Sequence, residues 1–269
     1  MLKLYDSPVS PCCMKVRLCL AEKDLNYEPV PVNLGAKANL EPDYLALNAK
    51  GVVPTLVDGD IPIVESTLIN EYLDDKFPDP PLKPAAPEAR VAMRLWTKFV
   101  DEELHPANGA VIWPILSLTG LRKRDPDEVR AMLSRHPDPK RVARQLAIFD
   151  QGFGAAVVGE GVKVFVSAVN KLETALDTDE YLAGNTFSLA DIALLPYVNE
   201  VMRFGIDALA EDKPNLHAWF ERVTARPSYR TAIGGVLPAE QWENIQARGR
   251  AAWEEIGAHL QPAAAQTSA

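Results

Sequence analysis

A proline-rich segment divides this chain into two parts with different patterns. Residues 78–87 contain five prolines in ten residues, which is typical of a linker. Short strand-like and helical runs alternate over the first 80 residues, whereas the patterns after the linker are helical. We therefore predict an α/β domain over residues 1–80, a linker over 81–88, an all-α domain over 89–259 and a frayed tail over 260–269.

The first part has the order strand, helix, strand, short helix, hairpin, helix. Asp58-Gly59 is a strong turn signal between two apolar runs and predicts the hairpin. The expected strands are Leu2–Tyr5, Tyr27–Val32, Thr55–Val57 and Ile61–Val64, and the expected helices begin at Ser10-Pro11, Pro42 and Ser66. The helices expected after the linker are Glu88–Leu104, Pro126–Ser134, Pro139–Phe153, Val162–Leu176, Ser188–Phe204, Pro214–Ala225 and Ala239–His259.

Composition excludes several classes of protein. The net charge of −9 argues against a nucleic-acid partner, which would favour a basic surface. Three cysteines, two of them adjacent, do not make a disulfide scaffold and suit a reducing compartment. No signal-peptide pattern or long apolar run is found, so we expect a cytoplasmic protein without a membrane partner. The four histidines lack metal-ligand spacing, so we expect no metal.

Three short segments carry candidate chemistry. Ser10, Cys12 and Cys13 lie at the first turn of a helix, where unpaired N–H groups and the helix dipole stabilise an anion such as a thiolate. Alternatively, Ser10 is only an N-cap and the cysteines are small apolar side chains. A cis bond at Val53-Pro54 would leave the Val53 backbone free for an extended peptide ligand, although an ordinary turn proline is the simpler interpretation. Glu65-Ser66 begins a helix and suits a zwitterionic group, or serves as a plain cap.

With these three segments in this order and spacing, the chain resembles the glutathione transferase superfamily over nearly its whole length. The resemblance implies a thioredoxin-like α/β N-terminal domain that binds glutathione and an all-α C-terminal domain that binds the second substrate. It further implies that Val53, before Pro54, pairs with the cysteinyl backbone, and that Glu65 and Ser66 hold the γ-glutamyl end. Candidates near the glycyl carboxylate are Lys50, Lys37 and Asn39, the last of which stands where some classes have a histidine.

The same resemblance assigns the catalytic position. Ser10 falls where serine-type transferases place the activating hydroxyl. The run from Ser10 to Arg17 is similar to the zeta-class motif, but Pro11 replaces the second serine of that class. Reductive dehalogenases share this motif, and in them the cysteine that matches Cys12 takes over the thioether from glutathione. Residues 94–103 and the helical insert 126–153 resemble the bacterial β-etherases, which cleave aryl ethers with glutathione, but the dehalogenases have a comparable insert, so the insert does not separate the two.

Two groups of residues are expected in the second domain. Ser188 and Asp191 fit the capping-box motif of the superfamily, and we assign them to folding. Aromatic and apolar side chains of the long helix and nearby segments are candidates for the substrate pocket, although each is as well explained by domain packing. These candidates are Trp96, Phe99, Val100, His105, Trp113 and Phe204.

We therefore predict a glutathione transferase in which Ser10 stabilises the glutathione thiolate for attack on an apolar or aromatic electrophile, such as an aryl ether. One alternative is a reductive dehalogenase or isomerase that uses Cys12. Another is a glutathione-binding module without catalysis. Glutathione is the expected co-substrate, and the resemblance implies a homodimer.

Overall fold

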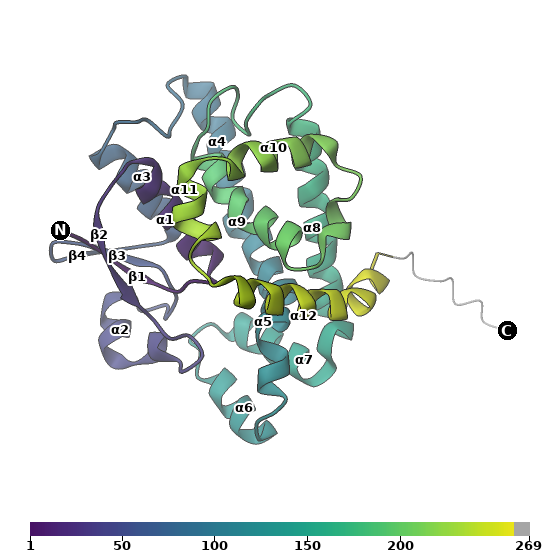
Figure 1. The fold of residues 1–269 in the computed structure, drawn as a ribbon. Coiled ribbons are helices and arrows are strands. Elements are labelled where there is room, and N and C mark those ends of the chain that lie inside the picture. Colours follow the sequence, from purple (N-terminus) through teal and green to yellow (C-terminus); the bar gives the residue numbers. More distant parts are fainter. Residues whose placement is uncertain (261–269) are drawn as a thin grey trace.

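The computed structural model of the chain describes residues 1–260, so the predicted tail lies outside the described residues except for Leu260. The N-terminal part is built around one sheet, and helices fill the rest of the molecule (Figure 1). The two parts share a hydrophobic core, in which Leu4 of the sheet and Leu18 belong to the same buried cluster as Leu195 and Trp219.

The sheet has four strands in the order β2-β1-β3-β4. The central strand β1 is parallel to β2 and antiparallel to β3, and β3 and β4 form the predicted hairpin. The mixed sheet and its helices match the predicted α/β domain. The elements are β1 (Leu2–Asp6), α1 (Pro11–Glu22), β2 (Tyr27–Pro31), α2 (Pro42–Leu47), β3 (Thr55–Asp58), β4 (Ile61–Val64) and α3 (Ser66–Lys76).

Helix α1 begins where the sequence predicts. Ser10 is the N-cap in an extended conformation, its hydroxyl oxygen accepts a hydrogen bond from the N–H of Cys13 at 3.4 Å, and Pro11 is the first helical residue. Residues 13–20 of the helix are buried, including Lys15 and Arg17. The helix therefore lies between the sheet and the second domain, and its first turn points into the junction of the two.

The second domain is helical, as predicted. Within residues 1–260, no single helix is long and apolar enough to cross a membrane; only α7 and α8 meet that criterion jointly, as a pair bent by 83°. The helices are α4 (Pro87–Phe99), α5 (His105–Leu121), α6 (Pro126–Ser134), α7 (Pro139–Gln151), α8 (Ala156–Ala175), α9 (Leu189–Arg203), α10 (Pro214–Thr224), α11 (Pro227–Tyr229) and α12 (Ala239–Ala258).

Helix α5 is the main difference from the sequence prediction, which ended the long helix at Leu104. The chain instead passes through a π-helical turn, Val100–Leu104, and continues helically to Leu121 with Pro114 inside the helix. Proline and glycine in this segment argue locally against a helix. Burial of one face, including Val111, Ile115 and other apolar side chains, outweighs these local costs.

Ion pairs with buried lysines join the elements around the linker. Lys23 has a fully buried side chain whose Nζ lies 2.7 Å from Asp74 Oδ1 and also donates to the carbonyl oxygens of Phe77 and Pro80 at 2.7 Å. Lys15 is also fully buried, and it donates to Thr67 of α3 at 3.0 Å and to Asp101 of the π-helical turn at 3.1 Å. These contacts hold α1, α3 and the start of the second domain in one arrangement.

The predicted capping box is present at α9. The Ser188 hydroxyl accepts from the N–H of Ala190, and the carboxylate of Asp191 accepts from the N–H of Ser188 at 2.9 Å. Asp191 is fully buried and also accepts from Leu182 N–H at 3.1 Å and from Trp219 Nε1 at 2.9 Å. Its role therefore extends beyond one helix end, because it joins three segments of the domain.

Candidate active site

A cavity of about 570 Å³ opens at the first turn of α1. Its walls come from both domains: the loops around β2 and β3 on one side, and α5, α6, α7 and α12 on the other. The wall on the side of the sheet includes Val9, Ser10, Pro11, Lys37, Asn39, Val52 and Val53. The structure thus brings Ser10 and Val53, which are far apart in the sequence, to one cavity with apolar and aromatic side chains.

Cys12 lies next to this cavity, in contact with side chains of the second domain. Its Sγ is 3.6 Å from Nδ1 of His105, which itself lines the cavity, and 3.9 Å from the hydroxyl of Tyr197. The Tyr197 hydroxyl lies 3.0 Å from the same Nδ1. Cys12 is partly exposed, whereas Cys13 and Cys19 are buried.

The surroundings of Cys12 favour its thiolate. Burial by itself raises the pKa of this thiol, but the charge of His105 and its hydrogen bond, the charge of Lys15 and the Ser66 hydroxyl together lower it to about 6. Burial raises the pKa of Cys13 well above its usual range. Of the two adjacent cysteines at this turn, only Cys12 is therefore a nucleophile at neutral pH.

A buried polar pair lies deeper in the second domain. The Asn108 amide donates to Glu200 Oε2, and both side chains are buried. Burial raises the pKa of Glu200 well above its usual range, because the charged form is disfavoured away from water. Both residues line the cavity, and the raised pKa of Glu200 weakens the negative charge that this carboxyl contributes there.

The Val53–Pro54 peptide bond is cis. The residue before Val53 is held by α2 and its C-cap: the Tyr44 hydroxyl and the Asn48 amide both donate to the carbonyl oxygen of Val52, at 2.6 and 2.9 Å. The Val53 side chain packs with Cys13 and Tyr44 in a small buried cluster. Within residues 1–260, the Val53 backbone has no backbone hydrogen-bond partner, so it remains available to a ligand in the cavity.

Glu65 and Ser66 begin α3 with an unusual backbone. Glu65 has a φ of 69°, a region that non-glycine residues rarely adopt and that is often found at functional sites. Its carboxylate is paired with Lys50 Nζ at 2.7 Å, and both side chains are largely exposed. Ser66 is the first residue of the helix, while Glu65 takes the N-cap position. Glu65 and Lys50, which are proposed to hold opposite ends of glutathione, therefore contact each other here.

Lys37 and Asn39 lie in the loop between β2 and α2, on the cavity wall. Lys37 has a left-handed backbone with φ 61°. Burial and the charges of Arg141, Arg124 and Arg135 lower its pKa. The Asn39 amide donates to the Gly51 carbonyl oxygen at 2.7 Å, which holds the loop against the segment before β3.

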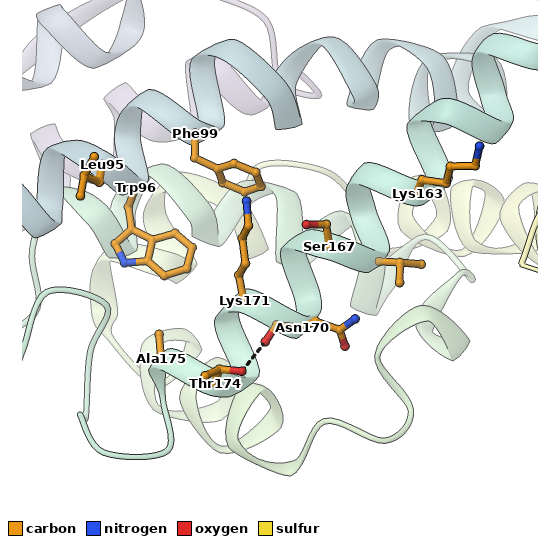
Figure 2. Close-up of a pocket in the computed structure, with 10 residues that line it drawn as sticks. Leu95, Trp96, Phe99, Lys163, Ser167, Asn170, Lys171, Thr174 and Ala175 are labelled. Atoms are coloured by element: carbon orange, nitrogen blue, oxygen red, sulfur yellow. Dashed lines mark hydrogen bonds between the residues drawn. The ribbon is translucent and has the colours of Figure 1, made fainter.

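The six residues proposed for the substrate pocket separate into three groups. His105 and Trp113 line the cavity at Ser10. Trp96 and Phe99 line a different groove between α4 and α8, where Figure 2 shows them across from Lys171 and Thr174. Val100 and Phe204 are fully buried in the core. The π-helical turn changes the helix face on which the residues after Phe99 project, whereas Phe204 lies at the end of α9.

Sequence reasoning missed several residues that the fold brings to the site. Tyr197 reaches Cys12 across 185 residues of sequence. His136, Arg141 and Arg144, from the end of α6 and from α7, line the cavity opposite Ser10. The insert was recognised as helical, but its cavity-facing positions depend on how α6 and α7 pack against α5.

Comparison with known proteins agrees with this arrangement. Residues 4–81 match the family model of the glutathione S-transferase N-terminal domain, and residues 158–227 match that of the C-terminal domain. Glutathione S-transferase 3 of Zea mays is 32% identical over 239 residues, 87% of this chain and 94% of the maize protein. The chain belongs to the glutathione S-transferase family.

Within this glutathione S-transferase family, a bacterial member shares the architecture. Protein LigF of Sphingobium sp. is 30% identical over 85% of this chain and 91% of its own length. The crystal structure of this β-etherase matches with a TM-score of 0.78 over 86% of this chain and 98% of LigF. The predicted fold, a thioredoxin-like domain followed by an all-α domain, is therefore confirmed.

Proposed function

We propose that this enzyme binds glutathione along Val53 and uses the Ser10 hydroxyl to stabilise the glutathione thiolate. The observation that carries the proposal is that Ser10 and the unpaired Val53 backbone line one cavity, at the N-terminus of α1. A hydrogen bond to the thiolate and the positive end of the helix dipole both favour the charged form. The Glu65 carboxylate and the Ser66 hydroxyl receive the γ-glutamyl end, and Lys37 or Lys50 the glycyl carboxylate.

The reaction is a nucleophilic displacement on an apolar or aromatic electrophile. The thiolate forms a carbon–sulfur bond while the bond to the leaving group breaks and its electron pair departs with that group. For an aryl ether the leaving group is a phenolate, which then takes a proton. Apolar residues, including Trp113, Leu116 and Ile245, line the cavity that receives the ring. Similarity to LigF favours an aryl ether, and holding both reactants together supplies much of the rate.

Titration calorimetry with glutathione and turnover of a chlorodinitrobenzene test this proposal. We expect binding, together with thiolate absorbance of bound glutathione near neutral pH. In Ser10→Ala the absorbance is lost at neutral pH, while Ser10→Thr keeps a hydroxyl and an N-cap and retains part of the activity. Absence of both binding and turnover in the folded wild-type enzyme rejects the proposal.

A second function is favoured by the contact of Cys12 with His105. Here glutathione first displaces a leaving group from an aromatic ring to form a thioether. The Cys12 thiolate then attacks the sulfur of the thioether. The carbon–sulfur bond breaks, the ring carbon takes a proton, and Cys12 and glutathione form a mixed disulfide. A second glutathione reduces this disulfide and leaves as oxidised glutathione. The lowered pKa of Cys12 supports this sequence of steps.

The two functions differ in which variant stops turnover. If Cys12→Ser retains turnover and Ser10→Ala abolishes it, the thiol-exchange reaction is rejected. If instead Cys12→Ser accumulates a glutathione thioether, detected by mass spectrometry, and forms no oxidised glutathione, Cys12 carries the second step. Val9→Ala, a change in a neighbouring cavity residue without a reactive group, serves as a control for general disturbance of the turn.

We also propose a homodimer, as the family resemblance implies. Large apolar side chains are exposed on three neighbouring elements: Ile61 on β4, Leu68 on α3, and Val91 and Leu95 on α4. Leu95 also borders the groove between α4 and α8 (Figure 2). An exposed apolar surface of this kind is typical of a protein–protein interface. Light scattering after size exclusion tests the proposal, with Leu95→Glu expected to shift the mass towards the monomer.

A further inference from the structure

The lining of the cavity carries an excess of cationic side chains, most of them on the wall formed by the second domain. Lys37 comes from the loop before α2, Arg141 and Arg144 come from α7, and Arg248 comes from α12. The one acidic residue among the lining residues is Glu200, whose pKa is raised well above its usual range by burial. The cavity lining therefore has more cationic than acidic side chains, although the whole chain is acidic.

The two α7 guanidinium groups have no anionic partner in the part of the chain described. Arg141 and Arg144 form no ion pair and donate no side-chain hydrogen bond within residues 1–260, and Arg144 Nε is buried without any partner. The carboxylate of Asp138 raises the pKa of both arginines, and its Oδ1 accepts the backbone N–H of Lys140 at 2.9 Å as the cap of α7. Buried polar groups are normally paired, so Arg144 Nε is a donor that a ligand in the cavity could satisfy.

Burial and neighbouring positive charges lower the pKa values of this group of side chains. Burial and the charge of Arg144 lower the pKa of Arg141, and burial lowers the pKa of Arg144. Burial and the charge of Arg141 lower the pKa of His136 to about 4, so this imidazole is neutral at neutral pH. A bound anion would relieve the repulsion and satisfy the free donors.

Arg144 is positioned against α5 on the face that carries His105. Residues 105, 109 and 113 are four apart and share one helix face. A Cβ at Gly109 would lie 2.9 Å from Arg144 Nη2, so the guanidinium packs directly over the glycine between His105 and Trp113. A negative charge at Cys12 acts on Arg141, which places this arginine within electrostatic reach of the thiol at the first turn of α1.

We propose that Arg141 and Arg144, supplied by the inserted α7, form a carboxylate-binding subsite in this cavity, with Lys37 and His136 at its edge. The apolar side chains around it, such as Trp113 and Leu133, would hold the body of the ligand. The preferred ligand is thus an acid with an apolar or aromatic body, and a guanidinium suits a carboxylate because it offers paired donors. This inference rests on the proposed glutathione transfer, since it names the ligand class of the same cavity.

Two carboxylates could occupy the subsite, and matched substrates separate them. One is an acid group on the electrophile, and the other is the glycyl carboxylate of glutathione. The electrophiles are a chlorodinitrobenzoate and its methyl ester, which differ in one negative charge. The thiols are glutathione and its glycyl ethyl ester. The variants are Arg141→Gln, Arg144→Gln and the double variant, and Lys140→Gln removes one charge from an exposed neighbour on the same helix.

In the arginine variants we expect the ratio of kcat/KM for a charged substrate to kcat/KM for its ester to fall. Loss of a charge-assisted hydrogen bond corresponds to roughly a tenfold to hundredfold fall. If the ratio falls for the benzoate pair, the subsite holds the electrophile's acid; if it falls for the glutathione pair, it holds the glycyl carboxylate. Lys140→Gln should change neither ratio.

Unchanged ratios for both pairs in folded Arg141→Gln and Arg144→Gln overturn the subsite. Absence of turnover by the wild-type enzyme with every thiol and electrophile instead overturns the proposed transfer reaction. In that case binding is read directly: calorimetry with the benzoate and with glutathione should show weaker binding by the double variant. Equal affinities of the wild type and the double variant for both ligands reject the subsite independently of catalysis.

Discussion

The sulfur of Cys12 lies 3.6 Å from Nδ1 of His105, a residue 93 positions further along the chain. Cys12 is in the first turn of α1, and His105 is the first residue of α5, directly after the π-helical turn. The contact therefore exists only because the two domains pack with α1 against the second domain. It converts a thiol at a helix N-terminus into one with an acidic pKa.

Alkylation of the native enzyme by iodoacetamide should modify Cys12 selectively. The thiolate is the reactive form, and the pKa of Cys12 is about 6, so the rate should rise as pH increases through about 6 and level off above it. Cys13 and Cys19 are buried and have raised pKa values, so they should not react. Mass spectrometry identifies the modified residue. A midpoint near that of a free thiol would contradict the prediction.

Replacement of His105 by Gln should raise the pKa of Cys12. The charge of His105 and its hydrogen bond lower this pKa, and loss of an opposite charge at this range raises it by roughly one to three units. The pH profile of alkylation measures the shift. His217→Gln is the matched control, because its imidazole contacts the carbonyl oxygen of Ala210 and is not among the groups that act on Cys12.

Replacement of Ser10 by Ala should lower kcat/KM for the halonitroarene roughly tenfold to a hundredfold, the effect of one hydrogen bond to a charged group. The variant also loses an N-cap, which costs about 1 kcal/mol of stability. Denaturant unfolding separates the two effects, and Ser10→Thr should restore the stability of the helix end. A Ser10→Ala enzyme with the wild-type rate would remove Ser10 from the mechanism.

Replacement of Glu65 by Gln should raise the KM for glutathione roughly tenfold, because the γ-glutamyl ammonium would lose its anionic partner. The rate at saturating glutathione should change much less. Asp60→Asn, at the exposed turn of the hairpin, is the control for loss of one negative charge. Lys50→Gln discriminates further: a raised KM assigns Lys50 to the glycyl carboxylate, whereas a lowered KM shows that it competes for Glu65.

Replacement of Asp191 by Ala should destabilise the fold by about 3 kcal/mol or more, because buried N–H donors lose their acceptor. The donors are the backbone of Leu182 and Ser188 and the indole of Trp219. Denaturant unfolding at neutral pH gives the free energy. Asp179→Ala, at an exposed position in the preceding loop, should stay within about 0.5 kcal/mol of the wild type.

Local chemistry in the sequence determined much of the fold. The Ser10-Pro11 start of α1, the Asp58-Gly59 turn and the Ser188–Asp191 capping box each depend on residues within a few positions of one another. Such features are set by backbone preferences and short-range hydrogen bonds, so they can be inferred from sequence. The candidate glutathione contacts could likewise be predicted, because Val53-Pro54 and Glu65-Ser66 are short motifs.

Only the tertiary structure decided the rest of the site. Helix α5 forms despite its prolines because one face is buried, and the π-helical turn before it places Trp96 and Phe99 in one groove and His105 and Trp113 in another. Packing of α7 against α5 then brings Arg144 over Gly109. These contacts join positions distant in the sequence, and no local pattern encodes them. The sequence by itself therefore determined the fold and the candidate glutathione-binding motifs, whereas domain packing decided the pKa of Cys12 and the charge of the cavity.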